Sequence, residues 1–268
     1  MSYNKINLER FNGLAEIYDQ HRPQPPLVLL EMISQWLQPE PLRLVVDIAC
    51  GTGLSTFVWA NRAEQVIGLE PNSEMRQLAQ ANQHASSSHT VQIRDGLAHQ
   101  TNLPDTCADL VTCAQALHWL EPTSTFTEVG RILRPKGLFV AYDYWGSPII
   151  DHTIEMALNR FWGIVKAKKQ LGFSVGINKW PKESHLQRME ESGQFQVVRR
   201  TWLHHQEKTN ATRLLGYVRS LSNVATLLKH GLSEDEIGLT QLSQSVHDHL
   251  GDKTVIGYFS YSVWLGVK

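Results

Sequence analysis

Three polar side chains in the first half of the chain are of types that bind or transform a small ligand. They are Asp47, Glu70 and His118. Each closes or follows a short run of apolar residues, as expected of strands that are covered on both faces of a parallel sheet. Ligands bind outside the carboxyl ends of the strands in open α/β sheets. We therefore expect these three side chains along one ligand-binding edge.

The turn after the first of these strands is the strongest pattern. It lies in the sequence VVDIACGTGLST, residues 45–56. Gly51 and Gly53 have no Cβ, so the backbone there can adopt a positive φ and a ligand can approach closely. A helix predicted to begin near Leu54 would direct its unpaired N–H groups at the same place. The pattern predicts a nucleotide-like cofactor at this turn.

Two cofactor classes use such a turn, and the neighbouring residues separate them. A dinucleotide fingerprint requires a third glycine, or an alanine, where this chain has Thr56. Asp47 would also place a carboxylate close to the diphosphate of a dinucleotide. The sulfonium and ammonium groups of S-adenosylmethionine are instead attracted to a carboxylate. The order D-x-x-C-G-T-G resembles motif I of the class I S-adenosylmethionine-dependent methyltransferases.

Glu70 is compatible with both cofactor classes. It ends the predicted strand 65–70, seventeen residues after Gly53, and a carboxylate there can accept the ribose hydroxyls of either cofactor. An NAD(P)-dependent oxidoreductase therefore stays open as a second hypothesis. A third hypothesis is a catalytically inactive protein that binds the cofactor without turnover.

A later segment favours the methyltransferase. The sequence IRDGLAHQTNLPDTCADLVTCAQALHWL, residues 93–120, resembles the type 11 methyltransferase family, and within it the subgroup of trans-aconitate-type small-molecule methyltransferases. The resemblance extends over residues 11–145. It implies an α/β fold with a Rossmann-like, doubly wound, seven-stranded sheet, mostly parallel with an antiparallel last strand, plus helical lid insertions. It also implies S-adenosyl-L-methionine as the cofactor.

The same resemblance implies which residues bind the cofactor. The set is Tyr18, Arg22, Asp47, Ala49, Gly51, Gly53, Glu70, Pro71, Ala98, His99 and Gln115. The two glycines would line the methionine and ribose, which the glutamate holds. Ala98 and His99 would flank the adenine, and Gln115 would lie beneath the sulfonium. Tyr18 and Arg22 would reach over the cofactor from the opening helix, where the planar guanidinium pairs with the methionine carboxylate.

The acceptor site is expected at the same edge of the sheet. Its candidate residues are His118, Trp119, Tyr144, Trp145 and Arg219. Methyl transfer mainly requires a nucleophile aligned behind the methyl carbon in a water-poor pocket. His118, with an ordinary pKa near ~6.5, is either the base for a hydroxyl acceptor or a positioning group, and Arg219 would anchor a carboxylate acceptor. We expect methylation of a small-molecule carboxylate or hydroxyl oxygen, giving S-adenosylhomocysteine.

The predicted strands and helices alternate along the chain, as in a parallel α/β sheet. Strands are expected at 42–49, 65–70, 90–94, 108–113, 137–143, 192–208 and 253–268, and helices at 7–20, 26–37, 54–62, 72–82, 122–133 and 211–231. We expect residues 1–146 to form the S-adenosylmethionine-binding core and 147–268 to complete the sheet. Helical segments at about 147–184 and 209–250 would form a lid over the acceptor pocket.

Composition limits the expected partners. The 268 residues include 25 Lys and Arg against 26 Asp and Glu, without a long basic run, which argues against nucleic acid or an anionic membrane as a partner. Cys50, Cys107 and Cys113 form no C-x-x-C pair and are expected as reduced thiols of a cytoplasmic protein, with no metal site. No apolar run approaches the length of a membrane span. A monomer or homodimer is expected.

Overall fold

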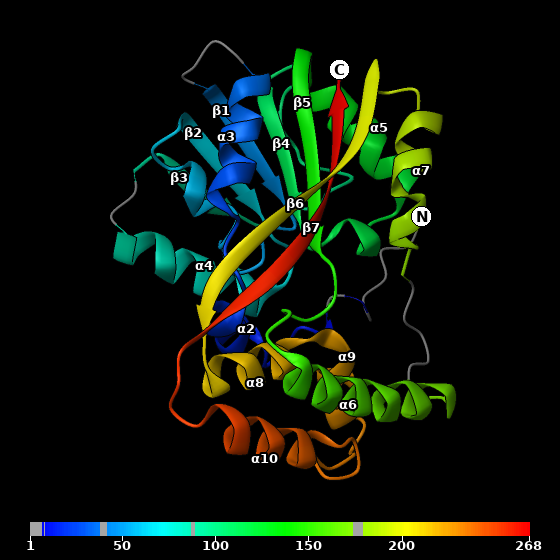
Figure 1. The fold of residues 1–268 in the computed structure, drawn as a ribbon. Coiled ribbons are helices and arrows are strands. Elements are labelled where there is room, and N and C mark those ends of the chain that lie inside the picture. Colours follow the sequence, from blue (N-terminus) through cyan, green and yellow to red (C-terminus); the bar gives the residue numbers. More distant parts are fainter. Residues whose placement is uncertain (1–6, 8, 38–41, 87–88, 174–178) are drawn as a thin grey trace. The chain divides into compact units, whose positions relative to one another are not determined.

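The computed structural model describes residues 7, 9–37, 42–86, 89–173 and 179–268. The chain folds into two compact units, whose elements are labelled in Figure 1. The sheet unit comprises Gln24–Trp145, Asn178–Leu203 and Tyr261–Lys268, and the helical unit comprises Met1–Pro23, Gly146–Ile177 and His204–Ser260. The functional division into a cofactor-binding core and an acceptor-pocket lid stays a prediction.

The described residues form a seven-stranded sheet in the order β3-β2-β1-β4-β5-β7-β6. The strands are β1 Leu42–Ile48, β2 Ala63–Leu69, β3 Val91–Arg94, β4 Ala108–Ala114, β5 Leu133–Tyr144, β6 Val197–Thr209 and β7 Val255–Val267. The first five pair in parallel, and β7 is antiparallel to β5. The chain order reverses between β1 and β4, which is the position where open α/β sheets bind ligands. The predicted fold class is confirmed.

Continuous apolar runs explain why the central strands are buried on both faces. Val45 and Val46 of β1 are both inaccessible to solvent, although successive side chains of a strand point to opposite faces. On one face, the ring of Phe126 lies 6.0 Å from that of Phe139 on β5, in an edge-to-face arrangement. Burial of each such large apolar side chain contributes about 1.5–3 kcal/mol. This packing fixes the positions of the strands and therefore of the residues at their carboxyl ends.

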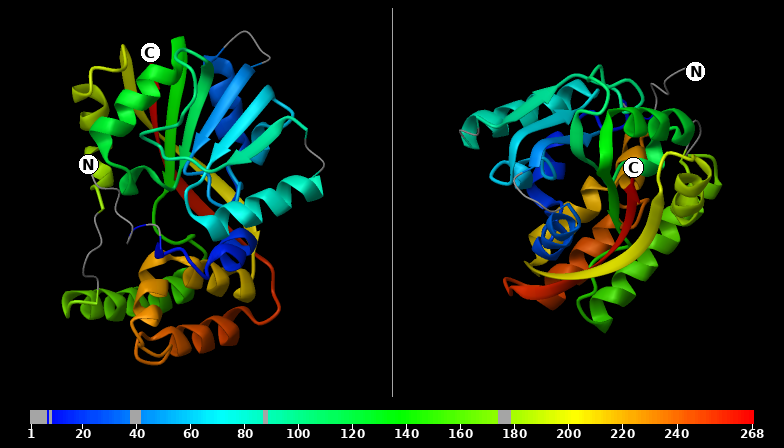
Figure 2. Two further views of the ribbon diagram at one scale, coloured as in Figure 1. Left: turned by 180° about the vertical axis from the view of Figure 1, so that it is seen from behind. Right: turned by 90° about the horizontal axis from the view of Figure 1, so that it is seen from above.

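The helices of the sheet unit cover both faces of the sheet. They are α3 Leu27–Trp36, α4 Ser73–Ser86, α5 Pro122–Ile132 and α7 His185–Glu191. In Figure 1, α3 lies in front of the strands and α5 behind them, and the reverse view in Figure 2 agrees. Helix α5 begins where it does because the Glu121 carboxylate accepts hydrogen bonds from the N–H groups of Thr123 and Ser124. The sheet is therefore doubly wound, as predicted.

The segment after the glycine turn differs from the prediction. Residues 54–62 form turns and one short 3-10 helix, η1 Phe57–Trp59, in place of an α-helix. The Thr56 hydroxyl donates to Asp47 Oδ2, and Ser55 Oγ is hydrogen-bonded to the Tyr142 hydroxyl. These bonds fix the two side chains to β5 and β1, and the backbone that follows them forms turns and a single 3-10 turn. The prediction of an α-helix that begins near Leu54 is therefore wrong.

Other boundaries are also shifted. The opening helix α2 covers Ala15–His21 and follows a turn that contains Gly13, whose φ is 72°. Strand β5 starts four residues before the predicted position. The predicted helix at 211–231 is two helices, α8 Ala211–Ser220 and α9 Ser222–Lys229, because Leu221 between them has an extended backbone.

The helical unit is built from helices packed in pairs. Its described helices also include α6 His152–Gln170 and α10 Leu239–Leu250. Helix α2 packs on α8, and α6 packs on α10. Gly216 is required at the first of these contacts, because a Cβ there would lie 2.3 Å from the ring of His21. This close approach brings Arg22, the residue after α2, within hydrogen-bond distance of Ser220 on α8.

Within the described ranges, the structure has no helix long and apolar enough to cross a membrane. The three thiols are unpaired: Cys50 and Cys113 are buried, and Cys107 is half-buried. Among the same described residues, His, Cys, Asp and Glu side chains form no group of three that could hold a metal ion.

Candidate functional site

The turn between β1 and η1 has the backbone geometry of a ligand cradle. Ala49, Gly51 and Gly53 have φ values of 54°, 60° and 90°. A Cβ on Gly51 would meet no other atom within 4 Å, whereas one on Gly53 would lie 2.3 Å from the ring of Phe57. The two glycines are therefore required for different reasons: Gly51 faces open space, and Gly53 allows the turn to pack on Phe57.

Glu70, the residue after β2, holds this turn in place. Its Oε2 accepts a hydrogen bond from the N–H of Gly51 at 2.8 Å, and its Oε1 accepts one from the N–H of Asn72 at 2.7 Å. Burial raises the pKa of Glu70 to about 7. Each carboxylate oxygen has a second lone pair, so the group can hold the turn and still accept hydroxyl groups of a ligand. Its neighbour Pro71 is half-buried.

Asp47 is more deeply buried than Glu70 and bonds only to side chains of the protein. Its Oδ2 accepts from the hydroxyl of Thr56 and its Oδ1 from that of Thr112, both at 2.7 Å. Burial raises the pKa of Asp47 to about 6. These two bonds connect β1 with the segment after the glycine turn and with β4. Direct contact of Asp47 with a cofactor stays a prediction.

The loop after β3 contains the two predicted adenine neighbours. Ala98 is buried against the apolar core, and His99 is half-buried. They lie at the tip of a tight turn that is closed by a hydrogen bond from the N–H of Gln100 to the carbonyl of Leu97 at 3.1 Å. Their contact with an adenine stays a prediction.

Gln115 follows β4 and connects that strand to β5. Its backbone φ is 57°, and its N–H donates to the carbonyl of Tyr142 at 2.9 Å. With the side-chain nitrogen directed at Asp143, Nε2 donates to Asp143 Oδ1 at 3.3 Å, and Oε1 accepts from the N–H of Tyr144 at 2.8 Å. Positive φ at residues other than glycine concentrates at functional sites, and Ala49 shows the same feature at the end of the neighbouring strand β1.

A cluster of charged and titratable side chains lies beside Gln115. We define the His118 cluster as His118, Asp143 and Lys182, which come from η2 Leu117–Trp119, from β5 and from η3 Lys182–Ser184. His118 Nδ1 lies 3.4 Å and Lys182 Nζ 3.2 Å from the same oxygen, Asp143 Oδ2. Sequence analysis identified His118 but missed the other two. Asp143 was hidden as an acid within an apolar strand, and no sequence signal pointed to Lys182.

The charges of the cluster set its protonation. Burial lowers the pKa of His118, against the opposing effect of Asp143, so the imidazole is neutral at neutral pH. Burial opposes ionisation of Asp143, yet His118 and Lys182 beside it hold the pKa of the carboxyl well below its ordinary value. His185 on α7 is a further neighbour, and burial lowers its pKa to about 4. A neutral imidazole next to a carboxylate is the arrangement of a general base.

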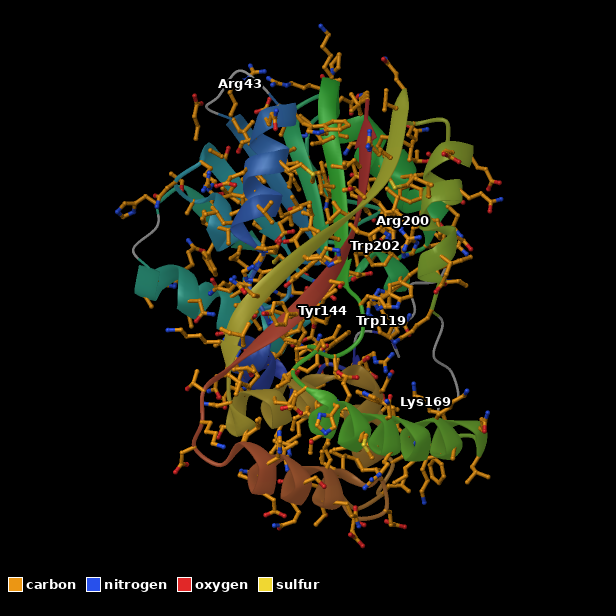
Figure 3. The ribbon with its side chains drawn as sticks, in the orientation of Figure 1. Arg43, Trp119, Tyr144, Lys169, Arg200 and Trp202 are labelled. Carbon is orange, nitrogen blue, oxygen red and sulfur yellow. The ribbon has the colours of Figure 1, made fainter. Side chains whose placement is uncertain are left out.

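Tryptophan and tyrosine side chains surround the cluster. The rings of Trp119 and His118 have centroids 4.8 Å apart, and Trp145 contacts Trp202 of β6 edge to face at 5.9 Å. Figure 3 labels Trp119, Tyr144 and Trp202 in this unit, with Arg200 on the same strand as Trp202. Tyr144 is buried, and its ring meets that of Tyr261 edge to face at 6.0 Å. His118 and Trp119 are thus neighbours, whereas the ring of Tyr144 packs on Tyr261 and that of Trp145 on Trp202.

The remaining predicted residues belong to the helical unit. Arg22 donates through Nε to Ser220 Oγ at 2.7 Å and through Nη2 to the Ser220 carbonyl at 2.8 Å. Its guanidinium lies 4.6 Å from the ring centre of Tyr18. Arg219 forms an ion pair with Glu234 at 3.1 Å. These arginines therefore have protein partners, and their predicted contacts with a cofactor or an acceptor stay predictions.

Residues 46–141 match the protein family described as methyltransferase domain. The match includes the glycine turn, Glu70 and Gln115, and it ends within β5. A solved structure from Anaeromyxobacter dehalogenans, assigned as a type II methyltransferase, shares the fold: the TM-score is 0.68 at 20% identity, over 92% of this chain and 97% of that one. Residues 46–141 are therefore similar to a methyltransferase domain, and the solved structure shows that the fold is shared.

Relatives among curated proteins agree with this family. An uncharacterized methyltransferase of Mycobacterium tuberculosis is 33% identical over 127 residues, which are 47% of this chain and 49% of the relative. A Saccharomyces cerevisiae protein assigned as an S-adenosylmethionine-dependent methyltransferase is 29% identical over 163 residues, 60% of this chain and 55% of the relative. The chain thus spans about half the length of the curated relatives it matches. These similarities do not single out the trans-aconitate-type subgroup.

Proposed function

We propose that this protein is an S-adenosylmethionine-dependent methyltransferase that methylates an oxygen of a small-molecule acceptor and produces S-adenosylhomocysteine. The observation that carries the proposal is the contact between Glu70 and Gly51. A buried carboxylate holds a backbone turn whose open side has room for a ligand. The turn therefore combines a shape that a nucleoside fits with an acceptor for its ribose hydroxyls.

The residues at this edge suit the cofactor. When bound, S-adenosylmethionine supplies a methyl group that is already activated by the positive charge on sulfur. Glu70 would accept hydrogen bonds from the ribose hydroxyls, and Gly51 would lie against the ligand because it has no Cβ. Ala98 and His99 would contact the adenine. In the helical unit, Tyr18 and Arg22 would contribute in the way that the sequence resemblance implies.

The acceptor side has a base that suits a hydroxyl group. His118 is neutral because burial lowers its pKa, and Asp143 lies beside Nδ1 at 3.4 Å. A proton on Nδ1 would face the carboxylate, which leaves the lone pair of Nε2 to accept the acceptor proton. Trp119, Tyr144 and Trp145 would bound the acceptor and keep water out.

The test begins with binding. Calorimetric titration should show that the protein binds S-adenosylmethionine and S-adenosylhomocysteine, and a fluorescence titration should show no binding of NADH. Binding of NADH alone would instead support an oxidoreductase. Formation of S-adenosylhomocysteine in the presence of acceptors then separates an enzyme from a protein that only binds the cofactor.

A further inference from the structure

The His118 cluster places a base and a cation on one carboxylate oxygen. His118 Nδ1 and Lys182 Nζ lie 3.4 Å and 3.2 Å from Asp143 Oδ2, while Asp143 Oδ1 faces the amide of Gln115. Asp143 is buried, and its Oδ2 is the oxygen that both His118 and Lys182 face. The imidazole and the ammonium group are therefore held side by side, within reach of one small molecule.

Both groups retain capacity for a ligand. A lysine ammonium has three donors, and one contact with Asp143 leaves two of them for another acceptor. The side chain of Lys182 is 26% exposed, against 1% for Asp143, so Lys182 lies at the outer side of the cluster. His118 directs Nδ1 at Asp143, which leaves Nε2 as the nitrogen for a ligand.

Lys182 is the cation of this cluster that can bind an anionic group of a ligand. Its Nζ lies 3.2 Å from Asp143 Oδ2, on the same oxygen that His118 faces. The other donors of the ammonium group can form charge-assisted hydrogen bonds with a carboxylate on the ligand.

Aromatic rings adjoin both polar groups. The Trp119 ring is 4.8 Å from that of His118, and Lys182 Nζ lies 6.0 Å from the ring centre of Trp145. Trp145 is 41% exposed, so part of this residue is accessible to a ligand. Tryptophan rings suit a planar ligand body that stacks on them or meets them edge to face.

We propose that the acceptor is a planar hydroxy acid whose hydroxyl and carboxylate groups are neighbours. This inference rests on the proposed function and specifies its acceptor. Lys182 binds the carboxylate, and His118 Nε2 takes the hydroxyl proton. The hydroxyl oxygen forms its new bond to the methyl carbon as the bond from that carbon to sulfur breaks, and the bonding electrons return to sulfur. Asp143 acts as a positioning residue for both side chains.

The first test uses the unmodified protein with four acceptors of similar size: 2-hydroxybenzoate, 4-hydroxybenzoate, phenol and benzoate. Formation of S-adenosylhomocysteine gives kcat/KM for each. We expect 2-hydroxybenzoate to exceed phenol and 4-hydroxybenzoate by about tenfold or more, the gain from one charge-assisted contact. Benzoate should not be methylated, because it has no hydroxyl proton for His118 to take.

A second readout does not depend on turnover. Calorimetry without the methyl donor should show that 2-hydroxybenzoate binds and phenol does not. In Lys182→Met, the preference for 2-hydroxybenzoate over phenol should disappear in both binding and kcat/KM, whereas Lys182→Arg should keep part of it. The control Lys136→Met changes an exposed lysine near the start of β5, the strand that contains Asp143, and it should leave the preference intact.

The outcomes separate the acceptor class from the general activity. Faster methylation of phenol than of 2-hydroxybenzoate, or an unchanged preference in a folded Lys182→Met protein, overturns the hydroxy-acid proposal while the methyltransferase stands. Methylation of none of the hydroxy acids by protein that binds S-adenosylmethionine also overturns it. Failure to bind S-adenosylmethionine at all removes the proposed function itself.

Discussion

The two halves of the carboxyl edge are built in different ways. At β1 and β2, Glu70 bonds to Asn72 and Gly51, which lie 2 and 19 positions away in the sequence within one strand–turn–strand segment. At β4 and β5, the His118 cluster joins side chains from three segments that lie far apart along the chain. The residues of the expected cofactor side thus come from one continuous segment, whereas those of the expected acceptor side come from three segments that the fold brings together. We infer that the second half can vary in specificity without loss of the first.

The largest expected effect is on the local half. Gly51→Val would put a branched side chain into the open space of the turn, at a φ of 60° where such residues are strained. We expect the affinity for S-adenosylmethionine to fall by more than about 100-fold, while the protein stays folded. Calorimetry and thermal unfolding measure the two quantities.

Gly193→Val is the matched control for this change. Gly193 belongs to the same unit, has a φ of 65°, and also has no atom within 4 Å of a Cβ. Backbone strain is therefore alike in both variants, but only one lies in the predicted cradle. Equal affinity losses in the two would show that strain, and not contact with the ligand, explains the result.

The next effect concerns the long-range half. Asp143→Asn should reduce kcat by about 100-fold, because the imidazole loses the carboxylate that orients it. Asp143 raises the pKa of His118, so its removal should also shift the acid limb of the pH–rate profile to lower pH. Steady-state rates between pH 4 and pH 9 provide both values. If the variant had a lower maximal rate but an acid limb at the same pH, the role of Asp143 would be merely structural.

The same contrast explains what sequence could and could not predict. Asp47, Gly51 and Glu70 lie in short motifs whose spacing is typical of a strand, a turn and a second strand, so their sheet edge was predictable. In place of the helix expected at 54–62, the structure has a segment whose Ser55 and Thr56 hydroxyls bond to Tyr142 and Asp47. Those partners become visible only once the strands are assembled.

The missed part of the acceptor side has the same physical origin. Asp143 sits inside an apolar strand where a buried carboxylate needs partners, but the sequence does not say which. Lys182 supplies one from a segment after the helical unit's α6. Arg219 was predicted as an anchor from its place on a helix, and the structure pairs it with Glu234. Isolated charged residues thus carry little information until their partners are known.

A smaller effect is expected at Glu70. Glu70→Gln keeps one acceptor oxygen but loses the charge, so affinity for S-adenosylmethionine should fall by about tenfold. Burial raises the pKa of Glu70 to about 7, so the unmodified protein should bind the ribose more tightly as the pH rises from 6 to 8. The variant should lose that dependence. Glu64→Gln, an exposed position on β2, is the control; if it matched the Glu70 variant, the ribose assignment would be wrong.

The smallest effect distinguishes the two acids of the local half. Burial raises the pKa of Asp47 to about 6, so folded protein holds a proton that the unfolded chain releases near pH 4. The stability linked to this proton is present below pH 4 and is lost as the pH rises through 6. His118 and His185, whose pKa values burial lowers, act in the opposite direction, so only a difference from a variant isolates the aspartate.

Asp47→Asn provides that difference. The free energy of unfolding of the unmodified protein, minus that of the variant, should fall by about 1 kcal/mol between pH 5 and pH 8. Urea unfolding without cofactor measures it. Because both oxygens of Asp47 bond to threonine hydroxyls, we expect the variant to change cofactor affinity less than Glu70→Gln does. A larger loss of affinity at Asp47 than at Glu70 would reverse their roles and make the deeper acid the direct ligand of the sulfonium.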